Sequence, residues 1–102
     1  MKKLIANREI DVNEEGYLTD FTQWDREIGK GIAEESNITM TDKHWEVIEY
    51  LQDKYHKEEP LSVRGIKKSG VIDIKEFYNL FPGGPLKIST KIAGIPKPKS
   101  CI

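Results

Sequence analysis

The sequence predicts a mainly α-helical α+β protein: a small helical bundle with an N-terminal β-hairpin and a flexible C-terminal arm. Apolar and charged residues alternate near the N-terminus, apolar residues recur every three or four positions after residue 22, and glycines and prolines interrupt the chain at 82–85. A chain of 102 residues accommodates one domain with one compact core. We therefore expect a single domain, 1–102, with a hairpin (1–18), a helical core (22–81) and the arm (82–102).

The N-terminal segment has the pattern of two short strands. Leu4–Ala6 and Glu9–Val12 lie on either side of residues 7–8, and Ile10 and Val12 alternate with charged neighbours. This alternation is typical of a half-buried hairpin. Residues 13–16 predict a second turn.

The spacing of apolar residues lengthens to that of a helix from Thr22 onward. Trp24, Ile28 and Ile32 recur every four residues, and Thr22 can cap the helix start. The first helix is expected to end near residues 36–37.

The second helix is the clearest element of the pattern. Thr41 is a good N-cap, Asp42 follows in the first turn where the helix dipole favours an anion, and Pro60 stops the helix. Its predicted apolar stripe, with Val47 beside it, consists of Trp45, Ile48, Leu51 and Tyr55. We expect both tryptophans, Trp24 and Trp45, to belong to the core.

Two shorter helices are predicted before the break at 82–85. One begins at Ser62 and ends at Gly70, and the other is capped by Asp73. Their expected inward residues are Val63 and Ile66 in the first, and Ile74, Phe77, Tyr78 and Phe81 in the second.

The chain changes character after the break. Residues 86–93 can form about two helical turns that end at Gly94. The alternating Pro96 and Pro98 favour an extended polyproline II conformation for the residues that follow. The only cysteine of the chain, Cys101, is its penultimate residue.

Composition narrows the classes of function. The apolar runs are too short to span a membrane, and the N-terminus does not have the pattern of a signal peptide. One cysteine cannot form an internal disulfide, so we expect a cytoplasmic protein. Residues 1–59 carry a net charge of −7 and residues 60–102 a net charge of +6. The two halves either contact different partners or fold against each other.

The thiol near the chain end is the main candidate for chemistry. A thiol on a projecting arm can enter the active site of another protein, and its thiolate can attack a disulfide or persulfide sulfur. Lys97 and Lys99 favour the thiolate, whereas the terminal carboxylate opposes them. Composition alone, however, favours an incidental cysteine.

Other candidate sites are weaker. His44 and His56 are expected to be solvated helix residues, and we expect no metal and no cofactor. No nucleophile–base pair is evident in the sequence. A basic second half with short helices resembles a helix-turn-helix nucleic-acid binder, but the acidic first half would repel phosphate, so specific nucleic-acid binding is not expected.

Several segments together resemble the DsrC/TusE family. The longest are FPGGPLK (81–87) and TKIAGIPKP (90–98), followed by Cys101. Shorter matches are Gly16-Tyr17-Leu18, Gln23-Trp24 and the segment HWEVI that begins at His44. The resemblance covers nearly the whole chain and implies a small helical fold with an arm whose Cys101 carries sulfur as a persulfide. It also places a basic residue, Arg64, facing the arm. We further expect Lys91, Lys97 and Lys99 to guide the arm into acidic clefts of partner proteins and to favour the thiolate.

The family divides over a second cysteine, eleven residues before the terminal one. This chain has Thr90 there. The single-cysteine pattern looks like the TusE branch, which takes sulfur from the TusBCD complex and delivers it to the tRNA 2-thiouridylase MnmA. This implies a sulfurtransferase-type carrier rather than a stand-alone enzyme. The alternative is a DsrC-like partner or regulatory subunit in dissimilatory sulfite reduction or sulfur oxidation, because Pro82–Pro85 and residues 60–74 look nearer to some DsrC-type members.

Overall fold

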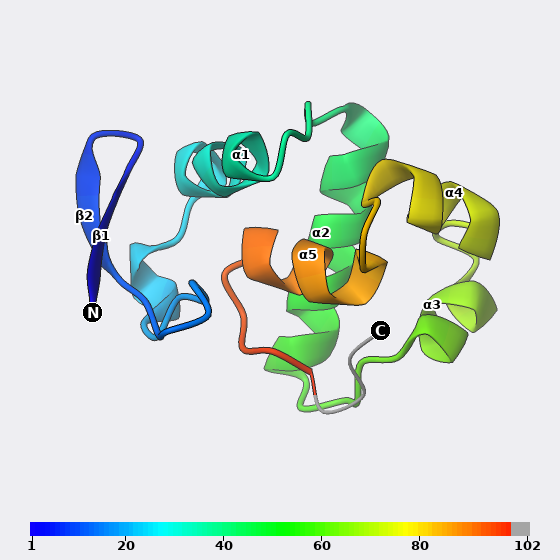
Figure 1. Cartoon of the computed structure of the whole chain (residues 1–102). Helices are drawn as coiled ribbons and strands as arrows, with labels where there is room; N and C mark the ends of the chain where they lie inside the picture. Colours follow the sequence, from blue (N-terminus) through cyan, green and yellow to red (C-terminus); the bar gives the residue numbers. More distant parts are fainter. Residues whose placement is uncertain (99–102) are drawn as a thin grey trace.

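A computed structural model describes residues 1–98 of the chain (Figure 1). A two-stranded antiparallel sheet precedes the helices, and α5 crosses α2 in the centre of the molecule. The elements are β1 (Lys2–Ile5), β2 (Arg8–Asp11), the 3₁₀ turn η1 (Phe21–Gln23), α1 (Arg26–Glu35), α2 (Asp42–His56), α3 (Val63–Ser69), α4 (Ile74–Leu80) and α5 (Pro85–Ile92). This confirms the predicted fold class of a helical domain with an N-terminal hairpin.

The hairpin turn lies one residue earlier than predicted. Ile5 pairs with Arg8, so the two turn residues are Ala6 and Asn7, both with positive φ. Positive φ at both positions is the type I′ geometry that matches the twist of two paired strands. Ile5 then packs against α1 at Gly31, where an added Cβ would lie 2.5 Å from the Ile5 side chain.

The predicted start of the first helix at Thr22 is wrong. Asp20 caps the 3₁₀ turn η1, the chain extends at Trp24, and Asp25 caps α1 with its side chain on the Ile28 amide. The guanidinium of Arg8 donates to the same carboxylate at 2.7 Å and, together with the Ile28 amide, lowers the pKa of Asp25 to about 2. An aspartate outcompetes the earlier threonine as the cap because it also receives this cation.

Helix α2 begins at the predicted cap. The prediction that His44, in its first turn, is solvated is wrong. His44 is buried, and its Nδ1 accepts from the Thr41 backbone N–H at 3.1 Å while Nε2 lies 3.0 Å from the Leu80 carbonyl oxygen. The imidazole thus takes the place of glutamate in a capping box and joins α2 to the end of α4. His56 is exposed, as predicted.

The predicted apolar faces are correct at most positions. Two predicted core tyrosines are instead exposed: Tyr55 and Tyr78. Trp24 and Trp45 are half-buried and pack against the core. The predicted caps of α3 and α4, Ser62 and Asp73, both accept the expected backbone amide. The largest fully buried side chains are Tyr17, Ile28, Val47, Ile48, Leu51, Ile66, Phe77, Phe81, Leu86, Thr90, Ile92 and Ile95.

Helix α5 lies inside the segment that the sequence suggested as an arm, yet it belongs to the core. It contacts α1, α2 and α4, and its residues Leu86, Thr90 and Ile92 are fully buried. Their spacing of two to four residues places them on the faces that contact those helices. The helical core therefore extends beyond residues 22–81, and the chain leaves the core only after Ile95.

Charge pairing mostly stays within the acidic half of the sequence. Among the ion pairs of residues 1–98, only Lys97–Glu15 joins the acidic half to the basic half. The two halves therefore do not fold against each other mainly through charge. Within residues 1–98, no helix is long and apolar enough to cross a membrane.

Gly94 is expected to be the position least tolerant of a side chain. Its φ is +73°, and a Cβ would lie 2.4 Å from the indole Cδ1 of Trp24. Gly94→Ala should lower the free energy of unfolding by about 2–5 kcal/mol, from left-handed strain plus overpacking. Gly70 is the matched control, because its φ is +76° but no atom lies within 4 Å of the added Cβ. Urea denaturation should show that Gly70→Ala lowers the free energy of unfolding by only about 1–2 kcal/mol. Equal losses of stability in the two variants would contradict the role given to Trp24.

Candidate functional site at the root of the arm

Two hydrogen bonds fix the point where the chain leaves the core, residues 92–95, which we call the arm root; from here on, the arm is the chain after Ile95. The Trp24 indole N–H donates to the Ile92 carbonyl at 2.7 Å, and the Gln52 amide donates to the Ala93 carbonyl at 2.8 Å. The last carbonyls of a helix have no partner within the helix, so these side chains complete the end of α5. Gly94 then turns the chain in the left-handed conformation, and Ile95 is fully buried.

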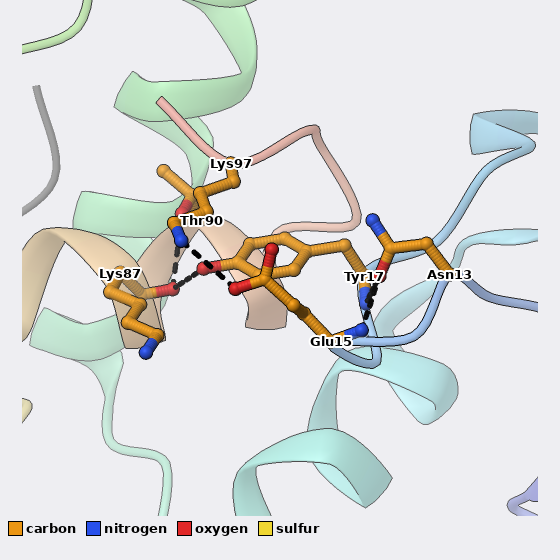
Figure 2. A network of polar contacts seen from close by, with 6 residues as sticks. All are labelled: Asn13, Glu15, Tyr17, Lys87, Thr90 and Lys97. Atoms are coloured by element: carbon orange, nitrogen blue, oxygen red, sulfur yellow. Dashed lines mark hydrogen bonds and ion pairs between the residues drawn. The ribbon is translucent and has the colours of Figure 1, made fainter. Parts of the chain in front are cut away.

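The other side of α5 is held by the segment after the hairpin. Tyr17 is fully buried, and its hydroxyl donates to the Lys87 carbonyl at 2.9 Å. The hydroxyl of Thr90 donates to the Leu86 carbonyl at 2.7 Å. It also donates to the Lys87 carbonyl at 3.1 Å (Figure 2). Position 90 is thus a buried site in a helix, and its hydroxyl is satisfied locally.

Lys91, predicted to support the arm, is half-buried at the end of α5. Its ammonium lies 5.1 Å from the centre of the Tyr17 ring, a cation–π distance. Burial lowers the pKa of Lys91, and the nearby ammonium groups of Lys87 and Lys3 lower it further. Lys91 is therefore positioned by the folded domain rather than projecting with the chain end.

Lys97 is the predicted site residue that makes a defined contact from the arm. Its ammonium donates to a Glu15 carboxylate oxygen at 2.9 Å, on the turn that follows the hairpin (Figure 2). This hydrogen bond lowers the pKa of Glu15, and the positive charges of Lys87 and Lys91 act in the same direction. Structure thus brings Lys91 and Lys97 to the same side of the domain as Glu15.

A groove of about 830 Å³ lies beside the first residues of the arm. It separates the arm from the end of α2 and the loop that follows. The lining residues are Tyr55, His56, Glu58, Glu59, Pro60, Leu61, Pro96, Lys97 and Pro98. The arm therefore leaves the core beside a surface whose lining includes both apolar and acidic side chains.

Three of the predicted site residues remain to be placed. Cys101 and Lys99 lie outside the described residues. Arg64 is exposed on α3, and its expected position facing the arm stays a prediction. No group of three or more His, Cys, Asp or Glu side chains suited to a metal ion occurs within residues 1–98.

Sequence reasoning missed four residues that define this site: Glu15, Tyr17, Trp24 and Gln52. The tyrosine and the tryptophan occur in the segments that match the DsrC/TusE family, so that resemblance offered a signal for both. Glu15 and Gln52 resemble ordinary surface residues in the sequence. Their contacts depend on residues 41 and 82 positions away, which no local pattern reveals.

Comparison with known proteins agrees with the resemblance. Residues 4–102 match the family described as "DsrC like protein". The chain is 36% identical to "Sulfurtransferase TusE" of Escherichia coli K12, over 97% of this chain and 98% of that protein. Its fold matches the solution structure of Allochromatium vinosum DsrC with a TM-score of 0.82 and 30% identity, and the oxidised dissimilatory sulfite reductase γ-subunit (DsrC) of Archaeoglobus fulgidus with a TM-score of 0.80 and 30% identity. Each match covers both structures completely.

A small helical domain with an N-terminal hairpin and an anchored last helix is the fold of the solved DsrC structures. The chain belongs to the DsrC-like family. Its TusE relatives are named sulfurtransferases, and together with the DsrC structures they support a sulfur-carrier role.

Replacement of Thr90 by cysteine should allow an internal disulfide with Cys101. Cys101 lies six positions after the buried Ile95, and a contour of roughly 20 Å over those positions is long enough to turn back over the ~6 Å of helix between 90 and 94. Under mild oxidation, Thr90→Cys should give a monomer that is 2 Da lighter, with both thiols blocked. The wild type should give only intermolecular dimers. An oxidised Thr90→Cys monomer with two free thiols would refute this expectation.

Proposed function

We propose that this chain is a persulfide sulfur carrier of the TusE type, with Cys101 as the residue that holds the sulfur. The observation that carries the proposal is the near-complete match to proteins named sulfurtransferase, in a chain whose only cysteine is its penultimate residue. The family resemblance assigns the persulfide to this position. The anchored arm root supports it, because a fixed base makes the position of the chain end depend on few residues.

The transfer needs no external oxidant. The Cys101 thiolate attacks the terminal sulfur of a donor persulfide, the donor S–S bond breaks, and the donor cysteine leaves as a thiolate. Cys101 now carries that sulfur through a new S–S bond. A thiolate of the acceptor protein then attacks the same terminal sulfur, and Cys101 leaves as a thiolate. The oxidation level of the sulfur is unchanged at each step.

The lysines near the arm favour this chemistry electrostatically. Lys97 and Lys99 lie four and two positions before Cys101, and a nearby cation favours the thiolate. Lys91 and Lys97 contribute positive charge on the side of the domain from which the arm leaves. Such charge attracts acidic clefts on partner proteins and increases the rate of association.

The proposed partners follow from the TusE resemblance. The donor is a TusBCD-like complex and the acceptor is a MnmA-like tRNA thiolase, which places the carrier in tRNA 2-thiouridine synthesis in the cytoplasm. The tRNA would contact the acceptor and not this chain, since residues 1–59 carry a net charge of −7.

A DsrC-like partnership with a dissimilatory sulfite reductase is the second candidate. The fold match to the γ-subunit from Archaeoglobus fulgidus favours it. Thr90 opposes it, because a hydroxyl at this position cannot take part in thiol–disulfide exchange. Affinity purification of the tagged protein from its native cells separates the two candidates by the complex that co-purifies.

Cys101→Ser should abolish sulfur transfer and leave the fold intact. The residue lies six positions beyond Ile95, the last fully buried side chain within residues 1–98, so the free energy of unfolding should change by less than about 0.5 kcal/mol. Intact mass after incubation with a persulfide donor should increase by 32 Da in the wild type only. Ser100→Cys in the Cys101→Ser background is the matched control for a thiol moved by one residue. Equal labelling of the serine variant would exclude Cys101 as the carrier.

The two arm prolines should matter for transfer but not for the intrinsic reactivity of the thiol. Six residues span roughly 19 Å as polyproline II but only roughly 13 Å on average as a flexible coil. Replacing Pro96 and Pro98 by glycine should therefore slow transfer to an acceptor protein by shortening the mean reach. Alkylation of Cys101 by iodoacetamide should stay within about twofold of the wild-type rate. Transfer at the wild-type rate would show that extension by proline is dispensable.

A further inference from the structure

The turn that follows the hairpin faces the arm and is itself unusually well fixed. The Asn13 side-chain oxygen accepts from the backbone N–H groups of Glu15 at 2.9 Å and Tyr17 at 3.0 Å. The backbones of Asn13 and Tyr17 are also hydrogen-bonded to each other. Tyr17 then fastens this turn to α5 through the Lys87 carbonyl. The backbone that carries Glu15 is therefore rigid relative to the arm root.

The Glu15 carboxylate is directed from this turn toward the first residues of the arm (Figure 2). It accepts from Lys97, two residues after the buried Ile95. Lys87 and Lys91 contribute positive charge around the same carboxylate. A fixed anion thus contacts the arm close to the position where the arm becomes independent of the core.

We propose that Glu15 is a positioning residue for sulfur transfer, which acts through Lys97 by fixing the direction in which the arm leaves the domain. Its effect on transfer rests on the proposed function, whereas its effect on the arm does not. Without the Glu15–Lys97 contact, Pro96 and Pro98 would still keep the arm extended, but the arm would rotate more freely about the residues after Ile95. In this proposal, the prolines determine how far the thiol extends from the domain, and Glu15 determines the direction in which the arm leaves it.

The strength of this contact suits a reversible role. Both side chains are partly exposed, at 38% for Lys97 and 49% for Glu15. Ion pairs of this kind change an equilibrium by only about 1.5- to 5-fold, and salt weakens them. An acidic partner surface can therefore replace Glu15 as the ion-pair partner of Lys97 with little loss of free energy. Glu15 would then restrict the direction of the arm in the free protein but not in the complex.

The arm direction can be measured because Cys101 is the only cysteine. A nitroxide on Cys101 broadens the amide NMR signals of the parts of the domain that it approaches. In the wild type at low salt, the broadening should be concentrated on one side of the domain. Glu15→Gln should spread it, and the resulting pattern should match that of the wild type in 1 M NaCl, where charges are screened over about 3 Å.

Two variants test the specificity of the effect. Glu14→Gln removes the same charge from the neighbouring, exposed position of the turn and should leave the broadening pattern unchanged. In a Lys97→Gln background, Glu15→Gln should have no additional effect, because its partner is already absent. An unchanged pattern in Glu15→Gln, an equal change in Glu14→Gln, or an additive change in the double variant would overturn the proposal.

Transfer rates complete the test on the unlabelled protein. Glu15→Gln should change the rate of sulfur transfer to an acceptor by about 1.5- to 5-fold at low salt, and the difference from wild type should vanish at 1 M NaCl. Alkylation of Cys101 by iodoacetamide should be unaffected. If Cys101 accepts no sulfur at all, the proposed function fails while the broadening experiment still decides the role of Glu15. If transfer occurs and Glu15→Gln matches wild type in both experiments, only the positioning role fails.

Discussion

The end of α5 is the constraint on which the rest of the structure depends. Its terminal carbonyls accept hydrogen bonds from Trp24, just before α1, and from Gln52 of α2. The indole also occupies the space that a side chain at position 94 would need. Only glycine therefore satisfies both the left-handed backbone conformation and the close packing against Trp24 at position 94. Helices α1 and α2 and the segment that carries Trp24 all contact α5.

This arrangement places the stabilising contacts before the segment to which the proposed chemistry is assigned. Buried side chains continue as far as Ile95, and the proposed sulfur-carrying residue lies six positions later. Changes at the chain end can therefore alter reactivity without a large effect on folding. The domain fold is retained at low sequence identity, with a TM-score of 0.82 at 30% identity to Allochromatium vinosum DsrC.

Much of the fold follows from local signals in the sequence. The caps Thr41, Ser62 and Asp73 and the stop at Gly70 lie where the pattern predicts them, because each acts within one helical turn. The errors have long-range causes. Asp25 displaces Thr22 as a cap with the help of Arg8, seventeen residues earlier, and His44 is buried because the Leu80 carbonyl lies against it. The sequence pattern assigns helix α5 to the arm because glycines and prolines interrupt the chain at 82–85, whereas its buried side chains belong to the core. Of the candidate site, the family resemblance identified Cys101 and the lysines, but Glu15 required the tertiary structure.

The buried hydroxyl at position 90 has a consequence for the lifetime of a loaded carrier. A second thiol within reach of the arm would attack the inner sulfur of a Cys101 persulfide, close a disulfide and expel hydrogen sulfide. Thr90 donates its proton to helix carbonyls and offers no such nucleophile. In the proposed carrier, the cargo therefore has no internal route of escape. The persulfide on the carrier therefore persists until it encounters a thiolate of an acceptor protein.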